Sequence, residues 1–197
     1  APCSISACKT SACSSDAAHI RAVCPRCGSL AFTSAPRASS SFTASAFPVL
    51  VCEKAIPSVV RRAAVDGRAL PLPKANPRRI VVLGDTGCRL KSSDRIFQGC
   101  NDAALWPFAA VADAAARGAP DLVIHVGDYH YRENECPAGN AGCAGSPWGY
   151  GWDAWEADVF EPAKALLAAA PWIVVRGNHE SCRRAGQGWW RLLDPRP

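Results

Sequence analysis

Short runs of aliphatic and β-branched residues punctuate the second half of the chain. Three of them share one form, an apolar segment that ends in glycine and a polar side chain, and they span residues 80–85, 122–128 and 172–179. Near-continuous apolar runs of this length are typical of strands in a sheet that is buried on both faces. The pattern therefore predicts three strands of one buried sheet.

An Ala-rich stretch at 102–118 lies between the first two predicted strands. Asn101 or Asp102 can cap its start, because short polar side chains accept hydrogen bonds from the first free amides of a helix. Gly118 is suited to end it. We predict a helix over this whole stretch.

A second stretch with apolar residues at roughly helical spacing covers 153–170. Pro162 lies inside it and is expected to divide it into two helices, since proline lacks the amide that a helix interior needs. The resulting order of strand, helix, strand, helix, strand predicts an α/β fold with the three strands in one sheet.

The first part of the chain has a different character. Residues 1–46 are rich in Ala, Ser and Cys without sustained periodicity, which predicts a low-complexity and disordered segment. Residues 47–52 form a short apolar run typical of an edge strand, and the prolines of 70–79 predict an extended linker. We thus expect short strand structure and linker over 47–79, and the α/β domain over 80–197.

Eleven cysteines in 197 residues is a high content. Five crowd the first 27 residues, and six are spread through the rest, namely Cys52, Cys88, Cys100, Cys136, Cys143 and Cys182. An even set in loops predicts disulfides and an oxidising compartment, so we expect a periplasmic or secreted protein. The favoured pairs, which each close a short loop, are Cys88 with Cys100 and Cys136 with Cys143.

Cys24 and Cys27 form a CxxC pair in the unpatterned segment. Such a pair can be half of a zinc site or a redox dithiol. A zinc ribbon needs a second CxxC some 15–20 residues further on, and the sequence has none. An unstructured segment is therefore the favoured interpretation, with a small zinc module as the alternative.

The formal net charge of +5 suits an anionic substrate. The basic residues are scattered, however, so binding to nucleic acid is not favoured. No apolar run approaches the roughly 18 residues that cross a bilayer, which predicts no membrane span. The chain contains no Met, so we expect a removed leader or a part of a longer protein.

All three predicted strands end in side chains that can bind metals. Asp85 and Asp128 follow the first two, and Asn178 and His179 follow the third. Ligands collect at the carboxyl ends of strands in such sheets. One Gly-Asp at a strand end is often only a helix cap, but three polar ends in succession favour a shared site.

These ends resemble the motifs of the calcineurin-like metallophosphoesterases. The sequence reads Gly-Asp-Thr-Gly at 84–87, Gly-Asp-Tyr-His-Tyr at 127–131 and Gly-Asn-His-Glu at 177–180. All three match the form found in the purple acid phosphatase branch. Gly87 stands where most of the family has a metal-binding histidine, and Tyr131 is placed to replace it.

The resemblance implies a fold, a cofactor and roles for site residues. The fold is the first half of a β-sandwich flanked by helices. The cofactor is two metal ions, Fe(III) with Zn(II), Mn(II) or Fe(II). Asp85 and Tyr131 would bind the first metal, Asp128 would bridge both, and Asn178 would bind the second. His179 would contact the phosphate and assist catalysis.

Other residues near the motifs carry weaker expectations. His125 lies inside a strand and is expected in the core or behind the metal ligands. His130 is a possible contact at the rim, and Glu180 is expected to orient His179 or to cap the following turn.

The loop at 132–152 is long, rich in glycine and aromatic residues, and leaves directly from the second motif. Long loops at strand ends are often functional. We expect a disulfide-pinned wall of the substrate cleft, with Trp148, Tyr150 and Trp152 near its mouth and the first two in contact with substrate.

The family's later histidine motifs, VxxH and GHxH, do not occur in the sequence. We therefore expect a truncated part of a longer hydrolase of small phosphate monoesters or diesters, with doubtful activity by itself. The alternative is a remnant or binding module that keeps the fold without catalysis. A haloacid-dehalogenase-type phosphatase is excluded for want of DxD after the first strand, and a P-loop nucleotidase for want of GxxxxGK[ST]. The sequence does not indicate an oligomeric state.

Overall fold

A parallel three-stranded sheet lies at the centre of the protein. The computed structural model describes residues 4–8, 17–24, 47–65 and 67–194. The central sheet has the order β10-β9-β6 and consists of β6 (Ile80–Leu83), β9 (Leu122–His125) and β10 (Trp172–Val174). Both pairings are parallel. The three predicted strands and the mixed α/β class are confirmed.

The two faces of this sheet differ in exposure. Val82 is paired with Ile124, which is paired with Ile173, so these side chains share one face. Val82 is 60% exposed, whereas Val123, on the opposite face, is fully buried. The expectation of a sheet buried on both faces is therefore wrong for the part of the chain that the structure describes.

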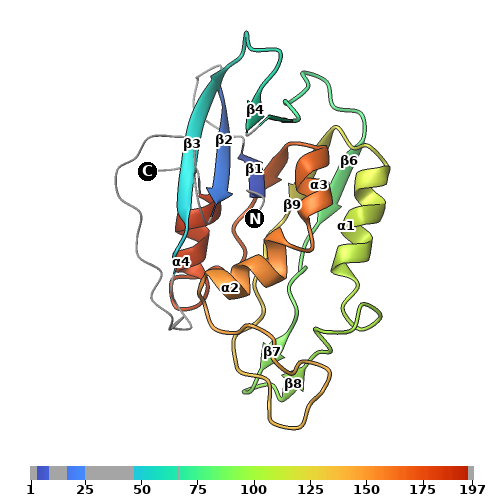
Figure 1. Ribbon diagram of the computed structural model, residues 1–197, viewed down its shortest axis with the longest axis vertical. Coiled ribbons are helices and arrows are strands. Elements are labelled where there is room, and N and C mark those ends of the chain that lie inside the picture. Colours follow the sequence, from blue (N-terminus) through green and yellow to red (C-terminus); the bar gives the residue numbers. More distant parts are fainter. Residues whose placement is uncertain (1–3, 9–16, 25–46, 66, 195–197) are drawn as a thin grey trace.

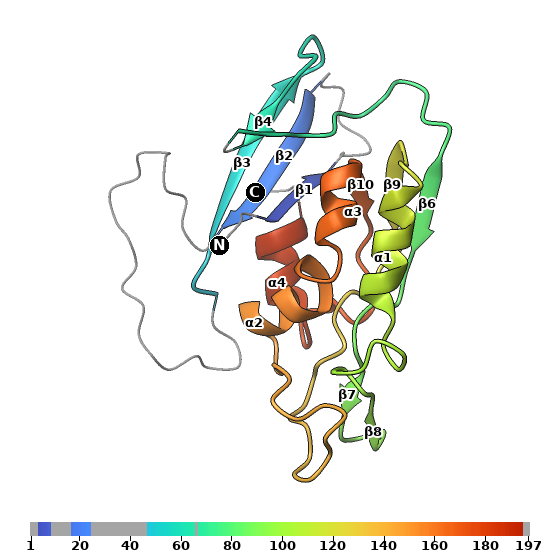
Figure 2. The same cartoon turned by 45° about the vertical axis from the view of Figure 1, so that its right-hand side comes forward.

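Two helices cover the buried face of the sheet. Both α1 (Phe108–Arg117) and α3 (Lys164–Ala169) lie on the same side of the central sheet and next to each other (Figures 1 and 2). The opposite face shows a set of exposed apolar side chains, those of Ile80, Val82, Val126 and Val175.

Helix α1 begins six residues later than predicted. Pro107 occupies its N-cap position, and Gly118 ends it as expected. The residues before it form a turn in which the amides of Leu105 and Trp106 donate to the carbonyl of Asp102. Pro107 has no amide to continue that hydrogen-bond series, and its fixed φ suits the start of a helix instead.

The stretch after the long loop is helical in three pieces. These are α2 (Trp152–Trp155), the π-helix η1 (Glu156–Phe160) and α3. Pro162 lies in the turn before α3, so the predicted division is confirmed. Trp152 is only 5% exposed and stacks on Phe160 with 5.3 Å between ring centroids, so its predicted place at a cleft mouth is wrong. Burying an indole of this size stabilises the core more than exposing it at a rim.

A second sheet occupies part of the segment that was predicted to be irregular. It has the order β1-β2-β3 and consists of β1 (Ser4–Cys8), β2 (Ala17–Cys24) and β3 (Leu50–Pro57). Antiparallel pairing along all of β2 satisfies backbone groups without any apolar periodicity, which is why the sequence pattern missed it. Cys27, and with it the zinc hypothesis, lies outside the described residues.

The remaining elements are short. Two hairpins are formed by β4 (Ala64–Val65) with β5 (Arg68–Ala69), and by β7 (Leu90–Lys91) with β8 (Ile96–Phe97). The last two elements of the described residues are α4 (Gly186–Gly188) and η2 (Trp189–Leu193). Within the described residues no helix combines the length and apolar character that a bilayer crossing requires.

Two disulfides confirm the favoured cysteine pairs. Cys88 is bonded to Cys100, and Cys136 to Cys143. Cys182 is a free and exposed thiol, so the expected framework of six bonded cysteines is wrong at this position. The first disulfide closes the loop that follows β6, and the second closes part of the loop that follows β9.

Candidate metal centre

The candidate ligands leave the sheet at one edge. Because β6, β9 and β10 are parallel, their carboxyl ends point the same way. Asp85, Asp128 and Asn178 follow these three ends after two, three and four residues. We call the residues that follow each strand its exit. Two backbone hydrogen bonds join the exits of β6 and β9: the amide of Asp85 donates to the carbonyl of Gly127, and the amide of Thr86 donates to the carbonyl of Asp128, both at 3.2 Å.

Three of the predicted ligands meet. The phenol of Tyr131 donates to Oδ1 of Asp85 at 2.5 Å and lies 3.4 Å from Oδ2 of Asp128. The backbone amide of His179 donates to Oδ1 of Asp128 at 2.9 Å. Asn178 directly precedes His179 and is exposed. The structure thus brings Asp85, Asp128 and Tyr131 together, and Asn178 adjoins His179, whose amide binds Asp128.

Both aspartates have unusual backbone conformations. Asp85 has φ of 54° and Asp128 has φ of 59°, in the left-handed region that disfavours side chains. Each such residue costs about 1–3 kcal/mol, and such residues gather at functional sites. No pattern in the sequence indicates these conformations, and both carboxylates reach the phenol of Tyr131.

The close approach of the exits requires glycine at position 177. A Cβ on Gly177 would lie 2.2 Å from Oδ1 of Asp128 and 2.3 Å from its amide nitrogen. No side chain fits there without moving the carboxylate. The glycine of the third motif therefore serves the packing of the second motif.

A buried carboxylate holds two exits together. Glu180 is fully buried and accepts hydrogen bonds at 2.9–3.2 Å from four backbone amides, those of Asp128, Tyr129, His130 and Gly177. Burial raises the pKa of Glu180, and the four amide bonds oppose that rise. The sequence led us to expect that Glu180 orients His179 or caps the following turn. Its carboxylate instead binds the amides of the second motif and so fixes the backbone that carries Asp128.

His179 lies against the phenol ring. Its ring centroid is 3.8 Å from that of Tyr131, and Nδ1 is 3.1 Å from the carbonyl of His130. Nη2 of Arg184 lies 2.6 and 3.0 Å from the two ring nitrogens of His179. Burial, and next the positive charge of Arg184, lower the pKa of His179. Both effects favour the uncharged imidazole, whereas the charges of Asp128 and Glu133 oppose them.

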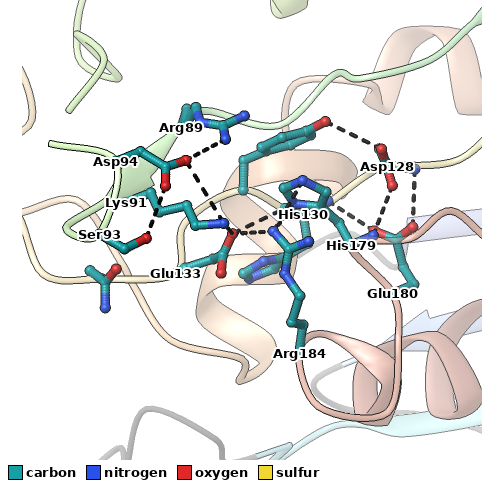
Figure 3. Close-up of polar contacts among 12 residues, drawn as sticks. Arg89, Lys91, Ser93, Asp94, Asp128, His130, Glu133, His179, Glu180 and Arg184 are labelled. Carbon is teal, nitrogen blue, oxygen red and sulfur yellow. Dashed lines mark hydrogen bonds and ion pairs between the residues drawn. The ribbon is translucent and has the colours of Figure 1, made fainter. Parts of the chain in front are cut away.

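Charged residues that sequence analysis did not identify form a series of polar contacts that begins at this histidine (Figure 3). Glu133 forms an ion pair with Arg184 and lies 3.6 Å from Nζ of Lys91. Asp94 pairs with Arg89 at 2.7 Å. No motif contains these residues, and only their position within a few residues of the ligands signalled them.

Two further histidines near the motifs, His125 and His130, are buried. His125 is in the core, with Nε2 2.9 Å from the hydroxyl of Thr86, which confirms its expected place. His130 is 1% exposed and packs between the rings of Tyr150 and Trp155. Its predicted rim contact is wrong, since the tight turn held by Glu180 directs its ring inward.

The aromatic side chains of the long loop divide into two groups. Tyr150 is half-buried and donates to Oε2 of Glu133 at 3.3 Å, close to the candidate site. Trp148 is 37% exposed and lines a separate pocket with Glu135, Ser146 and Asp153. The structure links Tyr150 to the charged residues around His179 and does not link Trp148 to them.

The donor set suits a cation. Burial, the bond to Asp85 and the charges of Asp128 and Asp85 all raise the pKa of Tyr131 well above its usual value. Three acidic groups that meet in this way repel one another unless a proton or a metal ion lies among them. In the described residues no three His, Cys, Asp or Glu side chains gather to hold a metal. A metal here would depend on the phenol of Tyr131 and the amide of Asn178.

Comparison with known proteins gives one match. The sequence model of the calcineurin-like phosphoesterase family matches residues 78–196. No curated protein and no solved structure matches the chain. The matched region contains β6, β9 and β10 and all the candidate ligands.

Proposed function

The chain belongs to the calcineurin-like phosphoesterases, a family of metal-dependent phosphoester hydrolases, and on this premise we propose that it hydrolyses phosphate esters at a dinuclear centre. Asp85 and Tyr131 would hold the first metal, Asp128 would bridge both, and Asn178 would hold the second. Small phosphate monoesters or diesters are the proposed substrates.

One observation carries this proposal: the phenol of Tyr131 lies against both Asp85 and Asp128. These residues come from two separate strand exits, and packing alone gives no reason to gather three acidic groups. A tyrosine gives up its proton at ordinary pH only beside a strongly acidic cation. The arrangement supports a metal site that uses phenolate.

The neighbourhood of Gly87 supports the purple acid phosphatase branch. A Cβ on Gly87 would lie 2.6 Å from the carbonyl of Tyr129 and 2.8 Å from the amide of Tyr131. There is no room for a histidine at this position, so Tyr131 supplies the donor instead. We therefore propose Fe(III) with Zn(II), Mn(II) or Fe(II) as the metal pair.

Bound metals of this kind supply an activated water and stabilise negative charge on phosphoryl oxygens. The chain's own residues would do the rest. His179, which lies against the ring of Tyr131, would contact a phosphoryl oxygen or assist the leaving group. The guanidinium of Arg184 adds positive charge on the same side. Both groups favour an anionic substrate.

The disulfides bear on our proposal for the compartment. Disulfides persist in oxidising environments and are rare in reducing ones. The bonds Cys88–Cys100 and Cys136–Cys143 support our proposal of a periplasmic or secreted protein.

The test is metal analysis of the full chain together with hydrolysis of aryl phosphate monoesters and diesters. We expect metal-dependent turnover that Asp85→Asn lowers by at least about a hundredfold. Asp113→Asn, which changes an exposed carboxylate on α1, is the matched control and should retain the activity. Metal binding without any turnover would favour a non-catalytic binding module of the same fold and refute the hydrolase.

A further inference from the structure

Asp158 is a fully buried carboxylate outside every recognised motif. It lies in the π-helix η1, and its side chain is 0% exposed. Nε of Arg132, itself 3% exposed, donates to Oδ1 of Asp158 at 2.6 Å. A buried ion pair gains little stability by itself, because both charges lose their hydration. Stability alone therefore does not explain why this ion pair is in the core.

The same carboxylate binds two backbone amides. The amide of Cys88 donates to Oδ1 at 2.9 Å, and the amide of Tyr131 donates to Oδ2 at 2.8 Å. The first amide belongs to the exit from β6, three residues after Asp85. The second belongs to the candidate ligand Tyr131 itself. Asp158 thus joins the two exits whose side chains meet at the candidate centre.

The backbone at Gly87 completes this arrangement. A Cβ on Gly87 would lie 2.8 Å from Oδ2 of Asp158 and 2.8 Å from the amide of Tyr131. The glycine lets the exit from β6 pass directly over the bond between Asp158 and Tyr131. The carboxylate and the glycine together fix how far Tyr131 lies from Asp85.

We propose that Asp158 is a positioning residue, which holds the backbone of Tyr131 and Cys88 so that the phenol of Tyr131 meets Asp85. This proposal rests on the proposed metal centre. Residues that orient metal ligands through hydrogen bonds typically change metal affinity or activity by roughly 10–100-fold when they are replaced. A residue that served only the core would change the stability of the protein and leave the affinity intact.

Asparagine is the informative replacement. Three donors, from Cys88, Tyr131 and Arg132, face the two oxygens of Asp158. An asparagine has one oxygen and one NH2 group of the same shape, so at least one of these donors would face another donor. Asp158→Asn therefore loosens the arrangement without a change of volume.

The test measures Zn²⁺ binding to the full chain by calorimetry and the hydrogen exchange of the Tyr131 amide by NMR. For Asp158→Asn we expect a Zn²⁺ dissociation constant that is raised roughly 10–100-fold and an amide that exchanges at least about tenfold faster. Val159→Ala is the matched control, because Val159 neighbours Asp158 on η1 and is 3% exposed. It should lower the melting temperature but keep Zn²⁺ affinity within about twofold of the wild type.

A second variant covers the case in which Asp158→Asn does not fold. Gly87→Ala places a methyl group against the same contact and keeps the charge of Asp158. It should weaken Zn²⁺ binding in the same way. Wild-type Zn²⁺ affinity and amide protection in Asp158→Asn, or an equal loss of affinity in Val159→Ala, would overturn the proposal.

Failure of the two proposals can be told apart. If the wild type hydrolyses no phosphate ester but Asp158→Asn still weakens Zn²⁺ binding and speeds exchange, the positioning role stands and the hydrolase does not. If Asp158→Asn hydrolyses esters with the wild-type kcat and KM, the hydrolase stands and the positioning role does not.

Discussion

The phenol oxygen of Tyr131 lies 2.5 Å from Oδ1 of Asp85, although 46 positions separate the two residues in the chain. Tyr131→Phe removes this oxygen and little else. We expect the variant to stay folded and to bind metal at least about tenfold more weakly. If the metal is ferric, any visible charge-transfer colour should be lost. Calorimetric titration and an absorption spectrum of the metal-loaded protein measure both effects, and a coloured variant would contradict the purple acid phosphatase assignment.

The number of bound metals distinguishes a bridging ligand from a terminal one. Asp128→Ala should remove both ions if its carboxylate bridges them, whereas Asn178→Ala should remove one. Metal content per chain, measured by mass spectrometry after dialysis, gives the two numbers. Loss of a single ion in Asp128→Ala would refute the bridge.

The Cys88–Cys100 disulfide should matter to the site, and the Cys136–Cys143 disulfide should not. Each closes a short loop, of 12 and 7 residues in sequence separation, so replacing either pair by serine should lower the free energy of unfolding by about 2–3 kcal/mol. Only the first pair includes a residue whose amide Asp158 holds. Paired measurements of denaturant unfolding and Zn²⁺ affinity should therefore show weaker binding for Cys88→Ser/Cys100→Ser alone. Equal losses of affinity in both double variants would contradict this.

The apolar strand pattern was enough to predict that the candidate ligands lie at one edge of a sheet. Parallel strands bring their carboxyl ends to the same edge in any fold. Glycine before each polar end marked the turns, and short loop lengths marked both disulfide pairs. These signals are local, so a single sequence carries them. They are sufficient to identify Asp85, Asp128 and Asn178 as candidate ligands.

The residues that hold the ligands in place could not be found in this way. Asp158 contacts Cys88 from 70 positions away in the chain, and Glu180 contacts Asp128 from 52. The packing of η1 against the strand exits decides which amides each buried carboxylate binds. Hydrophobic periodicity does not predict this packing. The ion pair of Glu133 with Arg184 could not be predicted either, because the sequence around a charged loop residue does not show whether that residue is solvated or paired.

The surroundings of Asp121 allow a prediction of how the free energy of unfolding depends on pH. Its carboxylate pairs with Lys74 and accepts the amides of Arg78 and Arg79 at 2.8 and 3.0 Å. The bond to Lys74, then the two amide bonds, lower the pKa of Asp121 well below its usual value. A carboxyl with a depressed pKa stabilises the folded state above its unfolded pKa, near 4, and loses this contribution as the pH falls below that value.

Asp121→Asn should therefore be less stable than the wild type at neutral pH, and the difference should shrink below about pH 4. Denaturant unfolding of both proteins between pH 3 and pH 7 measures it. Lys74→Met is the control: it removes the charged partner but keeps the two amide bonds, so it should show a smaller loss with the same direction. A difference between wild type and Asp121→Asn that is independent of pH would refute the assignment.

The two faces of the central sheet should respond differently to the same substitution. Val123 is fully buried and belongs to the main hydrophobic core, whereas Val82 is 60% exposed on the opposite face. Val123→Thr places a hydroxyl among apolar side chains and should lower the free energy of unfolding by about 1–3 kcal/mol. Val82→Thr keeps the shape and the strand propensity, and it should change stability by less than about 0.5 kcal/mol. Denaturant unfolding of the full chain measures both. A loss at Val82 as large as that at Val123 would mean that the apolar face formed by Ile80, Val82, Val126 and Val175 is covered in solution, because only a covered side chain is destabilised by an added hydroxyl to that extent.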